Sequence, residues 1–218
     1  MKDSLTDITL LLDRTGSMEV VRQETIQAVN TFLAEQQKVP GDALFSLIQF
    51  DSQAPFEVLQ RGVPIQQAQR LTPETYVPRA WTPLLDAIGR TIVDTGDRLS
   101  KLPEDDRPGK VVLAIMTDGQ ENASKEYTAD RVKQMLTHQQ EVYHWVVSFL
   151  GANIDAVQTA KDLGIDPKNA LTYDHTDHGV QCASASFSGH LAAYRMTGNR
   201  ASMHYTDHDR QQHKAGSR

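Results

Sequence analysis

The chain has 218 residues, a net charge of −6 at pH 7, 39% hydrophobic residues, 23% charged residues and a single cysteine. This length is enough to bury a sizeable core in one large domain, and the composition excludes the disordered, fibrous and disulfide-stapled classes. The acidic balance gives no reason to expect nucleic acid or an anionic membrane as a partner. Cys182 alone can form neither an intramolecular disulfide nor a cysteine-based zinc cluster.

The beginning of the sequence, MKDSLTDITLLLDRTG, lacks the basic start and the long apolar stretch of a secretory signal. Nowhere does a run approach the ~20 apolar residues that a membrane-spanning helix needs. We therefore expect a cytoplasmic protein with no membrane partner.

Short apolar runs alternate with segments of helical periodicity, which predicts an α/β domain. Three of the four longer runs are nearly continuous, as in strands buried on both faces of a parallel sheet. The expected strands are Ile8–Leu12, Leu44–Phe50, Lys110–Met116, Val142–Leu150 and Ala170–Tyr173. The expected helices are Val20–Gln37, Leu84–Leu99, Ala129–His138, Ile154–Leu163 and Cys182–Met196.

One further strand breaks the parallel pattern. Pro55–Gln60 follows the second strand after a short turn, so the two should form a hairpin with an antiparallel strand at the sheet edge. The expected fold is a doubly wound, mostly parallel central sheet with this one antiparallel edge strand and helices on both faces. We expect the domain to occupy residues 1–197. Residues 198–218 lose the apolar periodicity and are expected to form a flexible polar tail.

The segment Asp13-Arg14-Thr15-Gly16-Ser17 lies where the first expected strand ends and a helix begins, the edge at which ligands bind in open α/β sheets. One carboxylate and two hydroxyls stand at alternate positions on a turn made tight by Gly16. Hard oxygen donors of this kind suit Mg²⁺, Mn²⁺ or Ca²⁺. The structural alternative is that Thr15 and Ser17 cap the following helix while Asp13 favours its positive end.

Two more oxygen-bearing side chains stand at comparable places. Asp118 follows the strand over Lys110–Met116, and Thr82 stands just before the helix that begins near Pro83. Each has a structural alternative as well, because Asp-Gly is a common turn dipeptide and threonine is an ordinary N-cap residue.

Taken together, the three loops resemble the metal-ion-dependent adhesion site (MIDAS) of the von Willebrand factor type A (vWA) domain, the fold shared with integrin I domains. The similarity extends beyond the ligands, over the phrases ITLLLDRTGSM, WTPLLDAI and VVLAIMTDGQEN, and it covers roughly Leu5–Met196. The positions that match the family's metal ligands are Asp13, Thr15, Ser17, Thr82 and Asp118. Thr15 stands where the family more often has serine, and its extra methyl group stiffens the side chain and crowds the turn.

The resemblance implies a Rossmann-type three-layer domain that binds one divalent ion, Mg²⁺ or Mn²⁺, with Ca²⁺ as the less favoured ion. In the family, an Asp or Glu carboxylate of a protein partner takes the open position on the ion. It therefore implies a metal-dependent protein-binding module that has no catalytic residues and no small-molecule substrate.

Two alternatives from other classes remain. One is a Mg²⁺-dependent hydrolase or phosphoryl-transfer enzyme of the haloacid dehalogenase type, which needs a second carboxylate two residues after Asp13, where this chain has Thr15. The nucleotide-binding patterns G-x-x-x-x-G-K-[ST] and G-x-G-x-x-G after a strand are absent. The other alternative is a vWA-like scaffold that binds its partners without metal through another face.

Several polar residues near these loops have two interpretations each. Arg14 and Glu121 could contact the charge of a partner, or could simply be exposed. Asp86 should either complement the dipole of its helix or accept hydrogen bonds from a neighbouring loop. His175 and His178, in the segment Tyr-Asp-His-Thr-Asp-His, could bind a transition metal or lie in a solvated polar loop, and no third ligand can be assigned to them.

Overall fold

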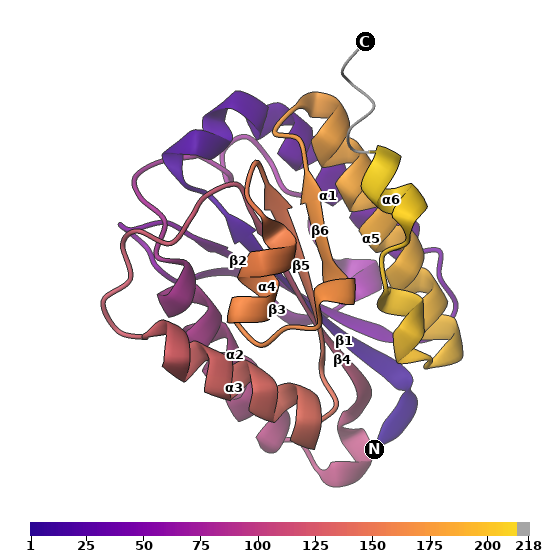
Figure 1. The fold of residues 1–218 in the computed structure, drawn as a ribbon. Coiled ribbons are helices and arrows are strands. Elements are labelled where there is room, and N and C mark those ends of the chain that lie inside the picture. Colours follow the sequence, from indigo (N-terminus) through magenta and orange to yellow (C-terminus); the bar gives the residue numbers. More distant parts are fainter. Residues whose placement is uncertain (213–218) are drawn as a thin grey trace.

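A single six-stranded sheet with helices on both faces forms the centre of the molecule (Figure 1) in the computed structural model, which describes residues 1–212. The strand order is β3-β2-β1-β4-β5-β6, and only the β2–β3 pair is antiparallel. The strands are β1 (Lys2–Asp13), β2 (Ala43–Phe50), β3 (Glu57–Pro64), β4 (Pro108–Thr117), β5 (Val146–Ala152) and β6 (Ala170–Tyr173). The expected mostly parallel sheet with one antiparallel edge strand is confirmed.

The helices lie in two layers, one on each face of the sheet. Figure 1 shows α1 and α5 on one face, with α6 alongside α5, and α2, α3 and α4 on the other. Their bounds are α1 (Arg22–Gln36), α2 (Leu84–Ser100), α3 (Ala129–Val142), α4 (Ala156–Asp162), α5 (Asp177–Thr197) and α6 (Asp207–Gln212). Over residues 1–212, none of these helices has the length and apolar character that crossing a membrane requires.

Each face of the sheet has its own apolar core, which explains why the strand sequences are nearly continuous in apolar residues. In β1, Ile8, Leu10 and Leu12 point into the core beneath α1 and α5, whereas Leu11 points into the core beneath α2 and α3. A strand that is buried on both faces has no side in contact with solvent, so apolar and polar residues do not alternate along it. The sequence pattern and the two-core architecture therefore have the same physical origin.

The topology places the carboxyl ends of two strands, β1 and β4, side by side. β1 lies between β2 and β4, and it pairs in parallel with β4 up to Leu12 opposite Met116. The chain leaves β1 toward β2 on one side and the sheet continues through β4 on the other, which is a topological switch point. The loops that follow Asp13 and Thr117 must therefore emerge next to each other.

Element boundaries differ from the sequence expectation most at β1, which begins at Lys2, six residues before Ile8, and by four or five residues at the end of β3 and around β5 and α5. Val142 belongs to the end of α3, so β5 begins four residues later than expected, at Val146. Helix α5 begins at Asp177, five residues before Cys182, because Thr176 caps it by accepting the Gly179 N–H at 3.1 Å. Local capping thus extends the helix into a polar stretch that apolar periodicity alone does not identify.

Residues 198–212 do not form the expected flexible tail. Gly198 ends α5 with a left-handed backbone (φ 68°), and the chain returns through a 3₁₀ turn over Arg200–Met203 into α6. Met203 is fully buried and Tyr205 is only 6% exposed, with its hydroxyl 2.8 Å from Ser148 Oγ on β5. The packed body therefore extends at least to residue 212, and residues 213–218 of the expected tail lie outside the described part of the chain.

Candidate metal centre

Asp13 is the residue of the site that hydrogen bonds hold in place on several sides. It ends β1, is fully buried and uses both carboxylate oxygens as hydrogen-bond acceptors. The Thr15 backbone N–H donates to Oδ1 at 2.7 Å, and the Thr117 hydroxyl at the end of β4 donates to Oδ2 at 2.6 Å. The Tyr76 hydroxyl donates to the Asp13 carbonyl oxygen at 2.7 Å. Asp13 is thereby held between the ends of β1 and β4.

The hydroxyl-bearing loop after Asp13 reaches the loop after β4. Ser17 Oγ donates to Asp118 Oδ1 at 2.8 Å although the two residues are 101 positions apart. Thr15 Oγ1 lies 3.2 Å from Ser17 Oγ in the same cluster. Ser17 is exposed, whereas Asp118 is nearly buried, so the cluster opens to solvent on the Ser17 side.

Thr82 enters the same site from the segment before α2. A Cβ atom on Gly119 would lie 2.8 Å from Thr82 Oγ1, which means that the threonine hydroxyl packs directly against the backbone that follows Asp118. Only a glycine at position 119 allows this approach without a displacement of the Thr82 side chain. The backbone of Thr82 is fixed in turn by Asn122, whose side-chain oxygen accepts the Thr82 N–H at 2.9 Å. The structure therefore brings all five residues of the predicted site to one edge of the sheet.

The capping alternatives for the two threonines are wrong. Thr15 precedes a 3₁₀ turn over Gly16–Val21, but its side chain makes no capping hydrogen bond. The N-cap of α2 is Pro83 and not Thr82, again without a side-chain cap. Both hydroxyls are thus free of the helix ends.

Arg14 and Glu121 make their polar contacts within the protein. Because Arg14 is buried, both interpretations of it, contact with a partner's charge and simple exposure, are wrong. Arg14 is 4% exposed, and its guanidinium pairs with Asp51 and Glu57 inside the protein. The Glu121 carboxylate accepts hydrogen bonds from the backbone N–H groups of its own loop and from the Leu85 N–H at the start of α2 (2.9 Å). Both residues hold the loops in position.

Asp86 fixes the far end of the loop after β4. Its carboxylate accepts three backbone N–H hydrogen bonds, each 2.8 Å long, from Lys125, Glu126 and Tyr127. Of the two interpretations of Asp86, hydrogen bonding to a neighbouring loop is confirmed. A carboxylate that satisfies three backbone donors ties α2 to this loop and limits the movement of Asp118 within it.

The electrostatics of the site favour a bound cation. The pKa of Asp13 is raised to about 6: burial is the largest cause, the nearby charge of Asp118 adds to it, and hydrogen bonds from Thr117 and Thr15 act in the opposite direction. Burial also raises the pKa of Asp118, against the hydrogen bond from Ser17 and the charge of His175. Both carboxylates are disfavoured in their charged form, and a cation between them would relieve that cost.

The donor set fits a hard divalent ion. Two carboxylates match the charge of the ion, and three hydroxyls add neutral oxygens, which is the ligand type that Mg²⁺ and Mn²⁺ take. Over residues 1–212, no cluster of three or more His, Cys, Asp and Glu side chains is arranged to hold a metal. A site here must therefore use the hydroxyls of Thr15, Ser17 and Thr82.

The raised pKa of Asp13 has a consequence for the metal-free protein. Because the folded-state pKa of about 6 exceeds the ordinary value of 3.8, the contribution of Asp13 to stability is fully present below about pH 4 and is lost as the pH rises through 6. We expect Asp13→Asn to flatten the stability curve between pH 4 and 7 when chelator is present. Urea unfolding of both proteins across this range measures the difference, and parallel curves would contradict the assignment.

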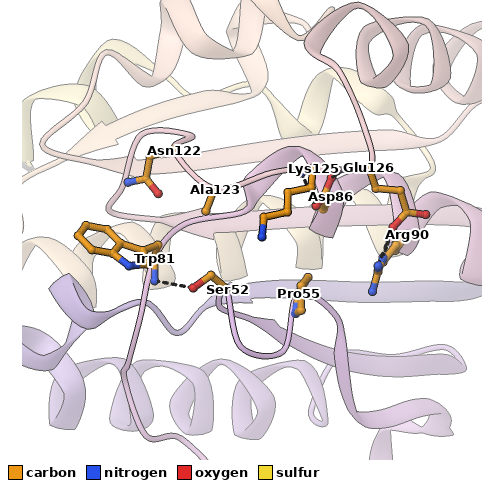
Figure 2. Close-up of a pocket in the computed structure, with 9 residues that line it drawn as sticks. All are labelled: Ser52, Pro55, Trp81, Asp86, Arg90, Asn122, Ala123, Lys125 and Glu126. Atoms are coloured by element: carbon orange, nitrogen blue, oxygen red, sulfur yellow. Dashed lines mark hydrogen bonds and ion pairs between the residues drawn. The ribbon is translucent and has the colours of Figure 1, made fainter.

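A cleft is lined by Trp81, the residue that precedes Thr82 in the chain, and by Asp86 of α2 (Figure 2). Its volume is about 890 Å³, and it is bordered by Trp81, Ser52 and the loop over residues 122–126. Trp81 is 69% exposed at the cleft, and its backbone N–H donates to Ser52 Oγ at 3.2 Å. Sequence reasoning gave Trp81 no role, because exposure of a single aromatic residue in a loop has no signature in the sequence.

No protein-family model and no curated protein matches this sequence. Solved structures do match its fold. Proximal thread matrix protein 1 from the mussel byssus, with a zinc-occupied MIDAS motif, has a TM-score of 0.58 and 14% identity over 84% of this chain and 47% of that chain. The von Willebrand factor type A protein from Catenulispora acidiphila has a TM-score of 0.56 and 11% identity over 89% of this chain and 43% of that chain.

A third match is the manganese-loaded TRAP protein of Plasmodium vivax, with a TM-score of 0.54 and 18% identity over 79% of this chain and 69% of that chain. The chain spans less than half the length of the mussel and Catenulispora chains. At these identities the likeness is one of fold. With its switch-point site and its single antiparallel edge strand, the chain has the von Willebrand factor type A fold.

Proposed function

We propose that this chain is a protein-binding module whose binding depends on a divalent metal ion. The observation that carries the proposal is the spacing of oxygens at the end of β1 and β4. Ser17 Oγ lies 2.8 Å from Asp118 Oδ1 and 3.2 Å from Thr15 Oγ1. Neighbouring ligands of an octahedral ion with bonds of about 2.1 Å are separated by about 3 Å, so these atoms are already at ligand spacing.

Five residues would hold the ion, which we propose to be Mg²⁺ or Mn²⁺: Asp13, Thr15, Ser17, Thr82 and Asp118. When bound, a divalent ion supplies a Lewis-acidic position that a carboxylate oxygen can occupy. The protein contributes a rigid cradle, because Asp13 is fixed by Thr117 and the Asp118 loop is fixed through Asp86. The printed descriptions of a zinc-occupied MIDAS motif and a manganese-loaded protein among the matched structures support a divalent ion on this fold.

The partner that suits such a site presents an exposed Asp or Glu. The chain has a net charge of −6, so long-range attraction does not bring an acidic partner to it and the contact must depend on the ion. The site opens to solvent at Ser17, which gives a partner access. The exposed indole of Trp81, next to Thr82, offers apolar area against which residues flanking the acidic side chain can pack.

The proposal assigns no catalytic step to the site. The hydrolase alternative needs a carboxylic acid two residues after Asp13, and the side chain in that place is the hydroxyl of Thr15. Assay of the metal-loaded protein on a generic phosphate ester tests this point, since turnover abolished by Asp13→Asn would favour the enzyme.

Partner binding is expected to require both the ion and Thr82. Peptide arrays that present Asp or Glu in varied contexts, each with its Asn or Gln counterpart, should retain the protein in Mn²⁺ and release it in chelator. Thr82→Ala should weaken retention about tenfold because it removes one donor, and the conservative Thr82→Ser should restore it. Full-strength binding by Asp118→Ala in chelator would show that the protein uses another face, as the metal-free scaffold alternative requires.

A further inference from the structure

We propose that the cleft lined by Trp81 binds the partner segment that flanks the metal-binding carboxylate, and that Lys125 pairs there with a second carboxylate of that segment. This inference rests on the proposed metal-dependent binding of a protein and specifies the partner as a doubly acidic segment with an apolar residue beside the first acid. The volume of the cleft, about 890 Å³, is typical of ligand-binding clefts.

Two residues that line the cleft connect it to Thr82 of the metal site. Trp81 directly precedes Thr82 in the chain. Asn122 holds the Thr82 backbone from both sides, because its side-chain oxygen accepts the Thr82 N–H at 2.9 Å and its own N–H donates to the Thr82 carbonyl oxygen at 3.1 Å. A partner segment that places a carboxylate on the ion therefore meets the cleft with its flanking residues.

A rigid backbone holds Trp81 at the surface. Its side chain is 69% exposed, although its N–H donates to Ser52 Oγ at 3.2 Å and its carbonyl oxygen accepts the Ser52 N–H at 2.9 Å. The preceding residue, Ala80, has a left-handed backbone (φ 59°), which is unfavourable for a residue with a Cβ atom. The Ala80 carbonyl oxygen accepts the Gly16 N–H of the metal-binding loop at 3.2 Å. The exposed indole is therefore fixed relative to that loop before any partner binds.

Lys125 is the charged lining residue whose side chain is available to an anion. Asp86 is only 4% exposed, and three backbone N–H groups donate to its carboxylate. Glu126 and Arg90 pair with each other at 2.6 Å. Lys125 is exposed, and within residues 1–212 its amino group takes part in no ion pair. Figure 2 shows this amino group pointing into the cleft, while the Lys125 backbone is held by Asp86.

The side chains that line the cleft fit an acidic segment with an apolar residue. Asn122 uses its side-chain oxygen to accept the Thr82 N–H, which leaves its amide N–H groups as donors beside the Lys125 amino group. A carboxylate can accept from both. The indole of Trp81 supplies apolar area for the residue next to the metal-binding acid. Because the chain as a whole is acidic, one lysine near the ion selects the register of the partner and contributes little long-range attraction.

Binding of short peptides to the Mn²⁺-loaded protein tests the role of Lys125. The probes are Gly/Ser peptides that carry an Asp, a Leu beside it and a second Asp about two to five residues from the first, each with a version in which the second Asp is Asn. At the spacing that binds best, this change should weaken binding about tenfold in the wild type and less than about twofold in Lys125→Ala. Lys101→Ala, which removes an exposed lysine at the opposite end of α2, should behave as the wild type. Lys125→Arg should retain the preference for the second Asp.

The same peptides test the role of Trp81. Trp81→Ala should weaken binding of the Leu peptides about tenfold and should have little effect on peptides in which Gly replaces the Leu. Trp81→Phe should keep most of the affinity. Tyr143→Ala removes another exposed aromatic side chain, which does not line the cleft, and should leave binding unchanged. Titration of free Mn²⁺ should give the same metal affinity for all these variants, because none of them replaces a proposed ligand.

The outcomes separate this proposal from the proposed function. If the wild type binds the peptides in Mn²⁺ and releases them in chelator, yet Lys125→Ala and Trp81→Ala bind them equally well, the role of the cleft is overturned and the metal-dependent function stands. If binding depends on Lys125 and Trp81 but persists in chelator and in Asp118→Ala, the role of the cleft stands and the dependence on metal falls. If the Mn²⁺-loaded wild type binds none of the peptides, both proposals are overturned.

Discussion

Addition of Mn²⁺ at a hundredfold excess over its dissociation constant is expected to stabilise the protein by about 2.7 kcal/mol, because the ion binds the folded chain and not the unfolded one. For a domain of this size, that corresponds to a rise in Tm of roughly 5 to 11 °C. Asp118→Ala and Asp13→Ala should abolish the rise while leaving the domain folded. Each removes one of the two charges that offset the ion. Thermal unfolding monitored by circular dichroism, with metal and then with chelator, measures the effect.

The control for this result is Glu126→Gln. Glu126 carries a carboxylate in the loop that follows the site, but it pairs on the surface with Arg90 (2.7 Å) and offers nothing to the ion. This variant should keep the full metal-induced rise. A wild-type Tm that is indifferent to millimolar Mn²⁺, Mg²⁺, Zn²⁺ and chelator would contradict an intact metal site.

Replacement of Met203 by alanine is expected to lower the free energy of unfolding by ~2 to 5 kcal/mol, the usual cost of removing a large buried side chain from a core. Met203 is fully buried in the core shared with α5, and Tyr205 is anchored to β5 two residues later. Deletion of residues 199–218 removes both anchors and should destabilise the protein at least as much. Urea unfolding of the variants measures the loss.

The exposed residue Gln211, in α6 of the same segment, provides the comparison. Gln211→Ala should change stability by less than about 0.5 kcal/mol, as surface substitutions usually do. Equal stability of the wild type, Met203→Ala and the truncated chain would show that residues 198–212 contribute no packing. The sequence expectation of a dispensable tail would then hold after all.

The two carboxylates of the site could be located from the sequence because they stand at strand ends, and strand ends can be located from apolar runs. The hydroxyls of Thr15, Ser17 and Thr82 are selected by the resemblance to the vWA metal site, since the residues alone also allow ordinary capping roles. Asp13 directly follows such a run, and so does Asp118 after one threonine. In a parallel sheet all carboxyl ends meet at one edge, so the spatial grouping follows from the pattern. The location of the protein in the cytoplasm, which no contact in the fold bears on, stays a prediction.

The residues that sequence reasoning misjudged are those whose role depends on a partner far away in the chain. Arginine side chains are usually exposed, yet the side chain of Arg14 is buried, because it pairs with Asp51, 37 positions later in the chain. His175 approaches Asp118 only because β6 and β4 lie on the same side of the switch point, with β5 between them. Neither pairing leaves a local pattern in the sequence.

By itself, the sequence determined the α/β class, the parallel sheet with its antiparallel edge and the oxygen donors at the ends of β1 and β4, because burial period and strand termini are local properties of a chain. Only the tertiary structure decided that the Thr15 and Thr82 hydroxyls are free of helix caps and that Met203 and Tyr205 close the core. Whether a side chain caps, pairs or packs depends on which distant segment the sheet order brings against it, and that order is set by the packing of the whole domain.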